Sequence, residues 1–187
     1  MSLDIGTVEI LWGVLEAATE TRTPFTLGYL GTVGAAGEPR VRAVILREVD
    51  VRAGTVAFAT DARTAKVQEL GRDPRVAVTF YDPDRDVQLR LEGTGEVVRD
   101  ADARRAAWDG LGEGSKRLYD KPLVPATSLA DVVSDGLGGG DGAAFERFAW
   151  VRVVVDAVDA IDLSGVEHAR VLHSRRSDRW VRTRLVP

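Results

Sequence analysis

Hydrophobic residues near the N-terminus recur at helical spacing. From Ile5 to Thr19 they fall at every third or fourth position, which predicts an amphipathic helix over about residues 5–19. After Pro24 the pattern changes to short runs rich in β-forming residues, separated by turns of glycine, proline and aspartate. The predicted strands are Phe25–Val33, Val41–Val49, Thr55–Thr60, Arg75–Tyr81, Val87–Val98, Phe148–Ile161, Ala169–Arg175 and Trp180–Leu185.

Two further helices are expected between these strands. Asp61 is placed to cap a helix over Ala62–Leu70, which Gly71 and Pro74 are expected to stop. Asp100 is placed to cap a second helix over residues 100–111. Because hairpin-connected strands outnumber helices, the pattern predicts a mainly β chain, an antiparallel barrel or sheet with peripheral helices, in a single domain over residues 1–187.

The stretch over residues 115–145 has no periodic pattern. It holds Pro122, Pro125 and a glycine cluster between Gly136 and Gly142. An irregular stretch of this length in a compact domain is typically functional or partly disordered. The glycines are interpreted as a flexible loop and not as a phosphate cradle, because no periodic helix follows them.

Composition and charge narrow the possible classes. The chain has 187 residues, no cysteine and a formal net charge of -4. The lack of thiols excludes disulfides and thiolate metal sites, and the mild acidity argues against a nucleic-acid binder. No apolar run has the length of a membrane span and no signal segment is recognised, so a cytoplasmic protein without membrane contact is expected. His168 and His173 follow no metal-ligand pattern, and no metal site is expected.

Residues 60–66 combine the features of an anion site. The segment passes from a predicted strand into the first turn of a predicted helix, where free backbone N–H groups and the helix dipole favour a negative charge. Arg63 and Lys66 place two cations on that turn, beside two threonine hydroxyls. Either a bound phosphate neutralises these cations or Asp61 and Glu69 pair with them at the surface, and the spacing alone leaves both possibilities open.

Two polar residues of the predicted strands have alternative interpretations. Arg42 shares a strand face with Val44 and Leu46, which would carry its guanidinium into apolar surroundings and require an anionic or hydrogen-bonding partner. Alternatively, it lies at the strand end and extends into solvent. Gln88 could donate and accept at the edge of a heteroaromatic ring, or be an ordinary residue of a barrel surface.

Four segments follow one another in the order of a known family's motifs. Arg42–Arg47 fits R-x-V-x-L-[KR], and Phe58–Leu70 fits F-x-T-[ND]-x-x-[ST]-x-K-x-x-[ED]-L. Asp73–Val76 then reads D-P-R-V, and Gln88–Gly93 reads Q-x-R-x-x-G. From Phe25 onward the chain therefore resembles the pyridoxamine 5'-phosphate oxidase-like family, whose members are flavoproteins with an FMN-binding split β-barrel, antiparallel and Greek-key-like.

The resemblance implies roles for the matching positions. The residues implied to hold the FMN phosphate are Arg42, Arg63, Thr64 and Lys66. Those implied to line the flavin ring and the ribityl chain are Ala43, Val44, Ile45 and Thr60. Gln88 and Arg175 would reach the ring from a partner chain, because the family builds each site at a homodimer interface. On this basis a phosphate is the expected partner of the cations in residues 60–66.

Several positions that contact substrate in the family carry other residues here. The lysine that ends the first motif is Arg47 in this chain, and the tyrosine and arginine that take the substrate phosphate map near Trp108 and Gly112. Pyridoxamine phosphate is therefore not the expected substrate. Arg47, Trp108 and His173 are expected to shape an altered substrate pocket.

The sequence thus predicts a homodimeric FMN-dependent oxidoreductase acting on an unassigned small molecule. A deazaflavin-dependent reductase on the same fold is one alternative. A non-catalytic module that binds FMN or haem is another, and a pyridoxal phosphate binder without turnover is a third. The colour and the turnover of the purified protein separate these possibilities.

Overall fold

The computed structural model describes residues 3–132, 142–177 and 179–187. The strands are β1 (Leu27–Val33), β2 (Pro39–Asp50), β3 (Thr55–Asp61), β4 (Arg75–Asp82), β5 (Val87–Val97), β6 (Phe148–Asp162), β7 (Ala169–Arg176) and β8 (Arg179–Leu185). The helices are α1 (Val8–Glu20), α2 (Ala65–Arg72), α3 (Ala101–Asp109), α4 (Glu113–Lys116) and α5 (Ala144–Arg147), with 3-10 turns at Pro24–Thr26 and Leu129–Asp131. The predicted mainly β chain with peripheral helices is confirmed.

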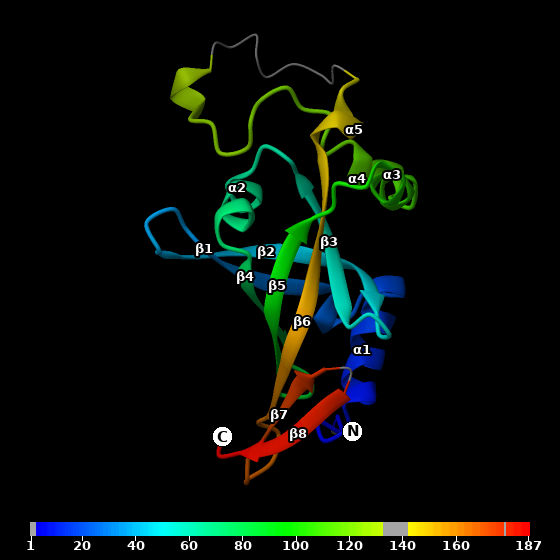
Figure 1. Ribbon diagram of the computed structural model, residues 1–187, viewed down its shortest axis with the longest axis vertical. Coiled ribbons are helices and arrows are strands. Elements are labelled where there is room, and N and C mark those ends of the chain that lie inside the picture. Colours follow the sequence, from blue (N-terminus) through cyan, green and yellow to red (C-terminus); the bar gives the residue numbers. More distant parts are fainter. Residues whose placement is uncertain (1–2, 133–141, 178) are drawn as a thin grey trace.

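The strands form one antiparallel sheet that closes on itself. They follow the order β3-β2-β1-β4-β5-β6-β7-β8, and β3 also pairs with β6. The first half of β6 pairs with β3 and the second half pairs with β7, while β5 runs beside both halves. Six strands therefore close into a barrel, and the β7–β8 hairpin extends from its lower end (Figure 1). This is the split-barrel fold that the sequence predicted.

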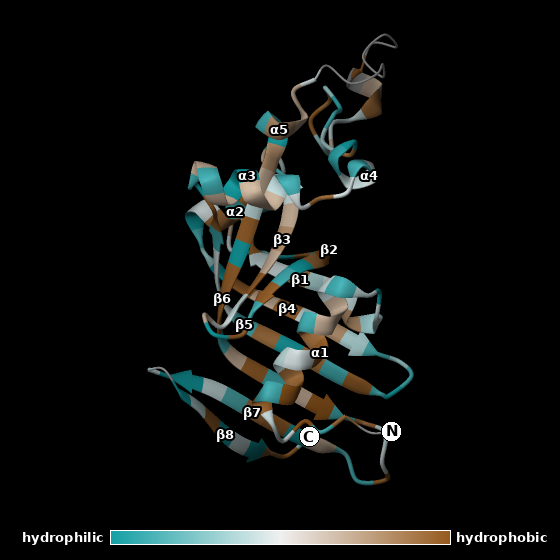
Figure 2. Cartoon of the chain, turned by 90° about the vertical axis from the view of Figure 1, so that its right-hand side faces the viewer, coloured by the Kyte–Doolittle hydropathy of each residue, from teal (hydrophilic) through white to brown (hydrophobic). Residues whose placement is uncertain are grey.

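The barrel interior is filled by the apolar face of each strand. Val87, Leu89 and Leu91 of β5 are all fully buried, which confirms the alternation read from the sequence. Burying each of these side chains contributes about 1.5–3 kcal/mol. Helix α1 closes one side of this core, and its apolar residues continue the core formed by the strands (Figure 2).

The N-terminal helix is confirmed, but it begins at Val8 and not at Ile5. The Asp4 carboxylate accepts hydrogen bonds from the Gly6 N–H and the Thr7 hydroxyl, and these local bonds hold the backbone in a turn ahead of the helix. Ile5 is still buried, so the helical spacing of apolar residues extended beyond the helix itself.

The second predicted helix starts later than expected, and Asp61 does not cap it. Asp61 is the last residue of β3, and its carboxylate is bonded to Arg63. Helix α2 has Thr64 at its N-cap position and runs through Gly71 to Arg72. The side-chain bonds of Asp61 to the residue two positions later, an Asx-type turn, therefore delay the helix.

Asp100 does cap α3, as predicted, by accepting a hydrogen bond from the Ala103 N–H at 2.8 Å. The prediction of an irregular stretch over residues 115–145 is wrong at its two ends, where the short helices α4 and α5 form. Phe25 lies in a 3-10 turn before β1 and not in the strand, because Thr23 and Thr26 form a capping box around it. Residues 133–141, which hold most of the glycine cluster, lie outside the described residues.

Candidate functional site

A pocket of about 210 Å³ lies where β2, β3 and the start of α2 meet the segment after α3. Its lining residues are Ala43, Val44, Ile45, Arg47, Ala59, Thr60, Lys66, Ser115, Leu118 and Tyr119. Six of these were predicted as site residues from the sequence. Ala59, Ser115, Leu118 and Tyr119 were missed, and the last three belong to a segment whose sequence carries no periodic pattern to place it.

Lys66 supplies the positive charge of this pocket. Its Nζ donates to the Thr60 hydroxyl at 2.9 Å, and among the described residues it forms no ion pair with a carboxylate. Burial, reinforced by the nearby Arg42 guanidinium, lowers the pKa of Lys66. Thr64 makes no side-chain cap at the start of α2, so the N-terminal N–H groups and the dipole of the helix add to the positive potential. The arrangement favours a bound anion.

Arg42 has an anionic partner inside the chain. Its Nη2 donates to Glu69 at 2.6 Å, and its Nη1 also contacts the Thr32 hydroxyl, which itself donates to Glu69. The guanidinium side chain is 23% exposed and the Glu69 side chain 8% exposed. Of the two interpretations of Arg42, the structure bears out the one in which it needs a partner, and that partner is a carboxylate of α2.

Arg63 does not face the pocket as an open cation. Its Nε and Nη2 donate to the Asp61 carboxylate at 3.0 and 2.7 Å, and its Nη1 and Nη2 also donate to carbonyls of residues 121–123. The surface-pair interpretation is therefore correct for Asp61 and Arg63. It is wrong for Glu69 and Lys66, because Glu69 pairs with Arg42.

One wall of the pocket rests on a cluster of aromatic rings. Tyr119 lies 5.9 Å from Trp108 and 5.5 Å from Phe148, measured between ring centroids. Burial raises the pKa of Tyr119 to about 12, so its phenol stays protonated near neutral pH. Trp108 packs behind Tyr119 and does not line this pocket. Arg47 does line it, and its Nη2 donates to the Ser115 hydroxyl at 3.3 Å.

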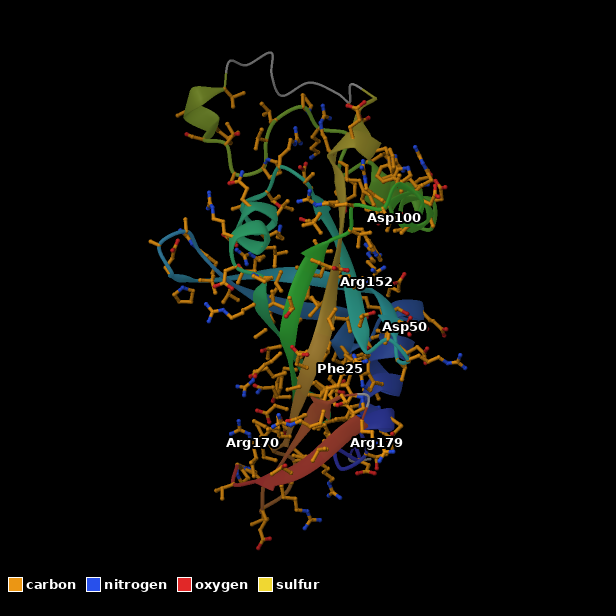
Figure 3. All side chains as sticks on the ribbon, viewed as in Figure 1. Phe25, Asp50, Asp100, Arg152, Arg170 and Arg179 are labelled. Atoms are coloured by element: carbon orange, nitrogen blue, oxygen red, sulfur yellow. The ribbon has the colours of Figure 1, made fainter. Side chains whose placement is uncertain are left out.

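Within one chain Gln88 does not line this pocket. Thr60 of the pocket pairs with Ala149 of β6, whereas Gln88 pairs with Ile161 of the same strand. These two β6 positions are twelve residues apart, which corresponds to about 40 Å along a strand. In Figure 3 Arg170, which pairs with Ile161, marks this lower end of the barrel.

Arg175 and His173, on β7, are also separated from the pocket. Arg175 donates to the Ala53 carbonyl at 2.7 Å. His173 is 2% exposed, and its Nε2 lies 2.9 Å from the Ile5 carbonyl oxygen. The structure therefore places His173 in the core beneath the N-terminal segment and not beside Arg47 and Trp108.

No helix within the described ranges is long and apolar enough to cross a membrane. The same residues contain no group of three histidine, aspartate or glutamate side chains that could hold a metal ion.

The fold and the cationic pocket define a protein of the split-barrel class. The family model described as pyridoxamine 5'-phosphate oxidase matches residues 15–134, and the chain belongs to this family. It is 34% identical over 173 residues to the pyridoxine/pyridoxamine 5'-phosphate oxidase of Anaeromyxobacter dehalogenans, covering 88% of this chain and 86% of that one. It is 38% identical over 167 residues to the corresponding oxidase of Caulobacter vibrioides, covering 84% and 74%.

Two solved structures share the whole architecture. A pyridoxamine 5'-phosphate oxidase-related, FMN-binding protein of Nostoc punctiforme superposes with a TM-score of 0.78 at 21% identity, covering all of both chains. PhzG of Burkholderia lata, solved with tetrahydrophenazine-1-carboxylic acid, superposes with a TM-score of 0.74 at 18% identity, covering 96% of this chain and 91% of that one. At these identities the two structures establish the fold.

Proposed function

We propose that the chain binds FMN and acts as an FMN-dependent oxidoreductase on a small molecule. The observation that carries this proposal is Lys66, a half-buried cation without a carboxylate partner among the described residues, at the uncapped start of α2 and in the wall of a pocket. A phosphate group fits this environment because it supplies the missing negative charge and accepts from both the ammonium group and the helix N–H groups. Family membership and the FMN-binding relative favour FMN as the carrier of that phosphate.

In this proposal the residues of the pocket have different roles. Lys66 and the first N–H groups of α2 would hold the phosphate, while the β2 backbone from Ala43 to Ile45 would lie along the flavin. Bound FMN supplies hydride and electron transfer, so no side chain has to act as a nucleophile. Arg47 and the protonated Tyr119 phenol would then orient a substrate by donating hydrogen bonds to it.

We further propose that the complete site forms between two copies of the chain. The pocket of about 210 Å³ is smaller than the ~300–1,000 Å³ usual for small-molecule sites, so one chain offers only part of an FMN site. The strand register places Ala43 beside Tyr29, and Tyr81 beside Gln88, on one outer face of the barrel. Tyr29, Val41 and Tyr81 are 52%, 69% and 43% exposed on this face, which suits it to an isologous contact.

The substrate is proposed to differ from pyridoxamine phosphate. Arg47 replaces the family's lysine at the end of the first motif, and it is held by Ser115 at the pocket wall. His173, which was expected beside the substrate, is bonded to the N-terminal segment. Pyridoxamine phosphate is accordingly expected to be a poor substrate, and efficient turnover would overturn this part of the proposal.

Cofactor content and cofactor loss test the proposed function directly. The purified protein should be yellow, release FMN on denaturation, bleach under a reductant and recover its colour in air. Lys66→Ala should weaken FMN binding about ten- to a hundredfold, since a charge-assisted hydrogen bond contributes about 1.5–3 kcal/mol. Combining it with Arg42→Ala should remove the flavin.

The matched control is Arg72→Ala, which deletes an exposed cation at the other end of α2 and should leave FMN binding unchanged. Stoichiometric FMN in the Lys66/Arg42 double variant would exclude this phosphate site. A bound haem, pyridoxal phosphate or deazaflavin in the purified protein would instead favour one of the other members of the fold class.

A further inference from the structure

The same short ion-pair motif stands on both sides of α2. In Asp61-Ala62-Arg63 and in Asp73-Pro74-Arg75, the aspartate accepts from the backbone N–H of the arginine two residues later, at 2.8 and 3.1 Å. In both motifs the arginine Nε also donates to the same carboxylate, at 3.0 and 2.9 Å. The Arg75 side chain is nevertheless 78% exposed and the Arg63 side chain only 25% exposed. Arg63 is thus covered by something that the local motif does not require.

The cover is a distant segment of backbone. Arg63 Nη1 donates to the Pro122 carbonyl at 2.9 Å, and Nη2 donates to the Lys121 and Leu123 carbonyls at 3.0 and 3.2 Å. Three consecutive carbonyls, 58 to 60 residues away in sequence, therefore converge on one guanidinium. The segment belongs to no strand or helix, so its carbonyls need donors from elsewhere.

This segment continues directly from the wall of the pocket. Leu118 and Tyr119 line the pocket, and residues 121–123 follow them within a few positions. In Figure 1 the chain after α4 passes above α2 and the end of β3. The Tyr119 ring is anchored on Phe148, so the wall has one attachment through its ring and a second through Arg63.

We propose that Asp61 and Arg63 form a clasp that positions residues 118–123 as the closing wall of the pocket, and that Arg63 is a positioning residue and not a phosphate ligand. The guanidinium has five N–H donors, and its contacts with Asp61 and the three carbonyls engage at least four of them. By accepting from Nε and Nη2, Asp61 holds the guanidinium that donates to these carbonyls. This inference rests on the proposed FMN site. There the clasp would slow the escape of a bound flavin, whether or not the ligand carries a phosphate.

The ion pair between Asp61 and Arg63 is expected to persist over a wide pH range. Burial alone would raise the pKa of Asp61, but the bonds from Arg63 outweigh burial and hold the pKa below its usual range. The Arg63 guanidinium does not lose its proton in the physiological range. The ion pair of the clasp is therefore retained near neutral pH, and replacing either of its members should favour the open wall.

FMN and riboflavin, which differ by the phosphate, distinguish a positioning residue from a phosphate ligand. Arg63→Ala should weaken both ligands by one common factor of about ten, as expected if the closed wall is populated a tenth of the time. Lys66→Ala should weaken FMN and leave riboflavin nearly unchanged. Arg75→Ala, which removes the matching motif without a covering segment, should change neither ligand. A loss confined to FMN in Arg63→Ala would show a phosphate ligand and overturn the clasp.

Amide hydrogen exchange without any ligand tests the clasp separately from the flavin. In Arg63→Ala and Asp61→Ala, exchange should accelerate in residues 117–123 and remain unchanged in β5, whereas Arg75→Ala should match the parent protein. Unchanged exchange in residues 117–123 would overturn the clasp even if FMN binds. Faster exchange there in a protein that binds no flavin would uphold the clasp and refute the proposed function alone.

Discussion

Glu69 accepts a hydrogen bond from Arg42 at 2.6 Å, and this contact joins α2 to β2 at the edge of the pocket. The acid also offsets part of the charge that Arg42 and Lys66 would otherwise present together, and it acts to raise the pKa of Lys66. Glu69 therefore has two opposite effects. It stabilises the free protein, and it competes with any anion that approaches the two cations.

Glu69→Gln should separate these two effects. The variant leaves Arg42 without its charge partner. The free energy of unfolding should fall by about 2 kcal/mol, which is below the range for fully buried pairs because Arg42 is partly exposed. Thermal unfolding measures this change. The affinity for FMN should rise, by roughly tenfold, because a competing carboxylate is gone. Glu38→Gln is the matched control, since Glu38, just before β2, pairs with Arg40 where the two side chains are 37% and 57% exposed, and it should destabilise the protein less than Glu69→Gln does. Weaker FMN binding in Glu69→Gln would contradict the competition.

Lys66 makes the free protein less stable in its charged form. Because its folded-state pKa lies below its ordinary value, the unfolded chain binds more protons in the interval between the two, and this contribution to stability rises with pH across that interval. Lys66→Met should therefore raise the melting temperature near neutral pH, and the gain over the parent protein should shrink as the pH increases through the interval.

The same shift predicts how anion binding depends on pH. FMN binding requires the ammonium form of Lys66, so the affinity should fall as the pH rises through the lowered pKa, and this alkaline decline should be absent from Lys66→Met. Titrating FMN by flavin fluorescence at a series of pH values measures it. An alkaline decline that persists in the variant would assign the decline to another group.

Local patterns were sufficient to predict most of the fold. Val87, Leu89 and Leu91 alternate with polar residues, and the strand they predicted is present with all three buried. Asp100 caps its helix as predicted, since no cation among the described residues binds its carboxylate. Asp61 had the same local features, but Arg63 occupies its carboxylate, and the helix starts three residues later than predicted. A cap is predictable only when no nearby cation binds it.

The candidate site was predictable to the extent that its residues are close in sequence. Lys66 follows Thr60 by six residues and could be recognised as a cation at a helix start. The contacts of Arg63 with residues 121–123 and the entry of Tyr119 into the pocket depend on tertiary packing across about 60 residues, which no local pattern encodes. Nor could a local pattern show that Thr60 and Gln88 pair with β6 residues that are twelve positions apart.

The turn that receives Arg175 should tolerate no side chain. Gly54 has a φ of +68°, and a Cβ there would lie 2.5 Å from Arg175 Nη1. Gly54→Ala should therefore cost the strain of a left-handed residue, about 1–2 kcal/mol, and also displace Arg175 from the Ala53 carbonyl. Gly37→Ala, at a φ of +85° with open space around it, carries the strain alone. Equal decreases of the melting temperature in the two variants would show that displacing Arg175 does not destabilise the protein.

Lys66 lines the pocket and Gln88 of the same chain does not, so the proposed two-chain site can be tested by mixing. If each site combines Lys66 of one chain with Gln88 of the other, Lys66→Ala and Gln88→Ala homodimers both have two defective sites. A heterodimer of the two variants has one site with both changes and one site with neither. Unfolding and refolding an equal mixture should therefore restore native FMN binding in roughly a quarter of the sites, since half of the dimers are mixed. Flavin retained after desalting measures this fraction. If the mixture binds no more FMN than the separate variants, Gln88 does not complete the partner's site.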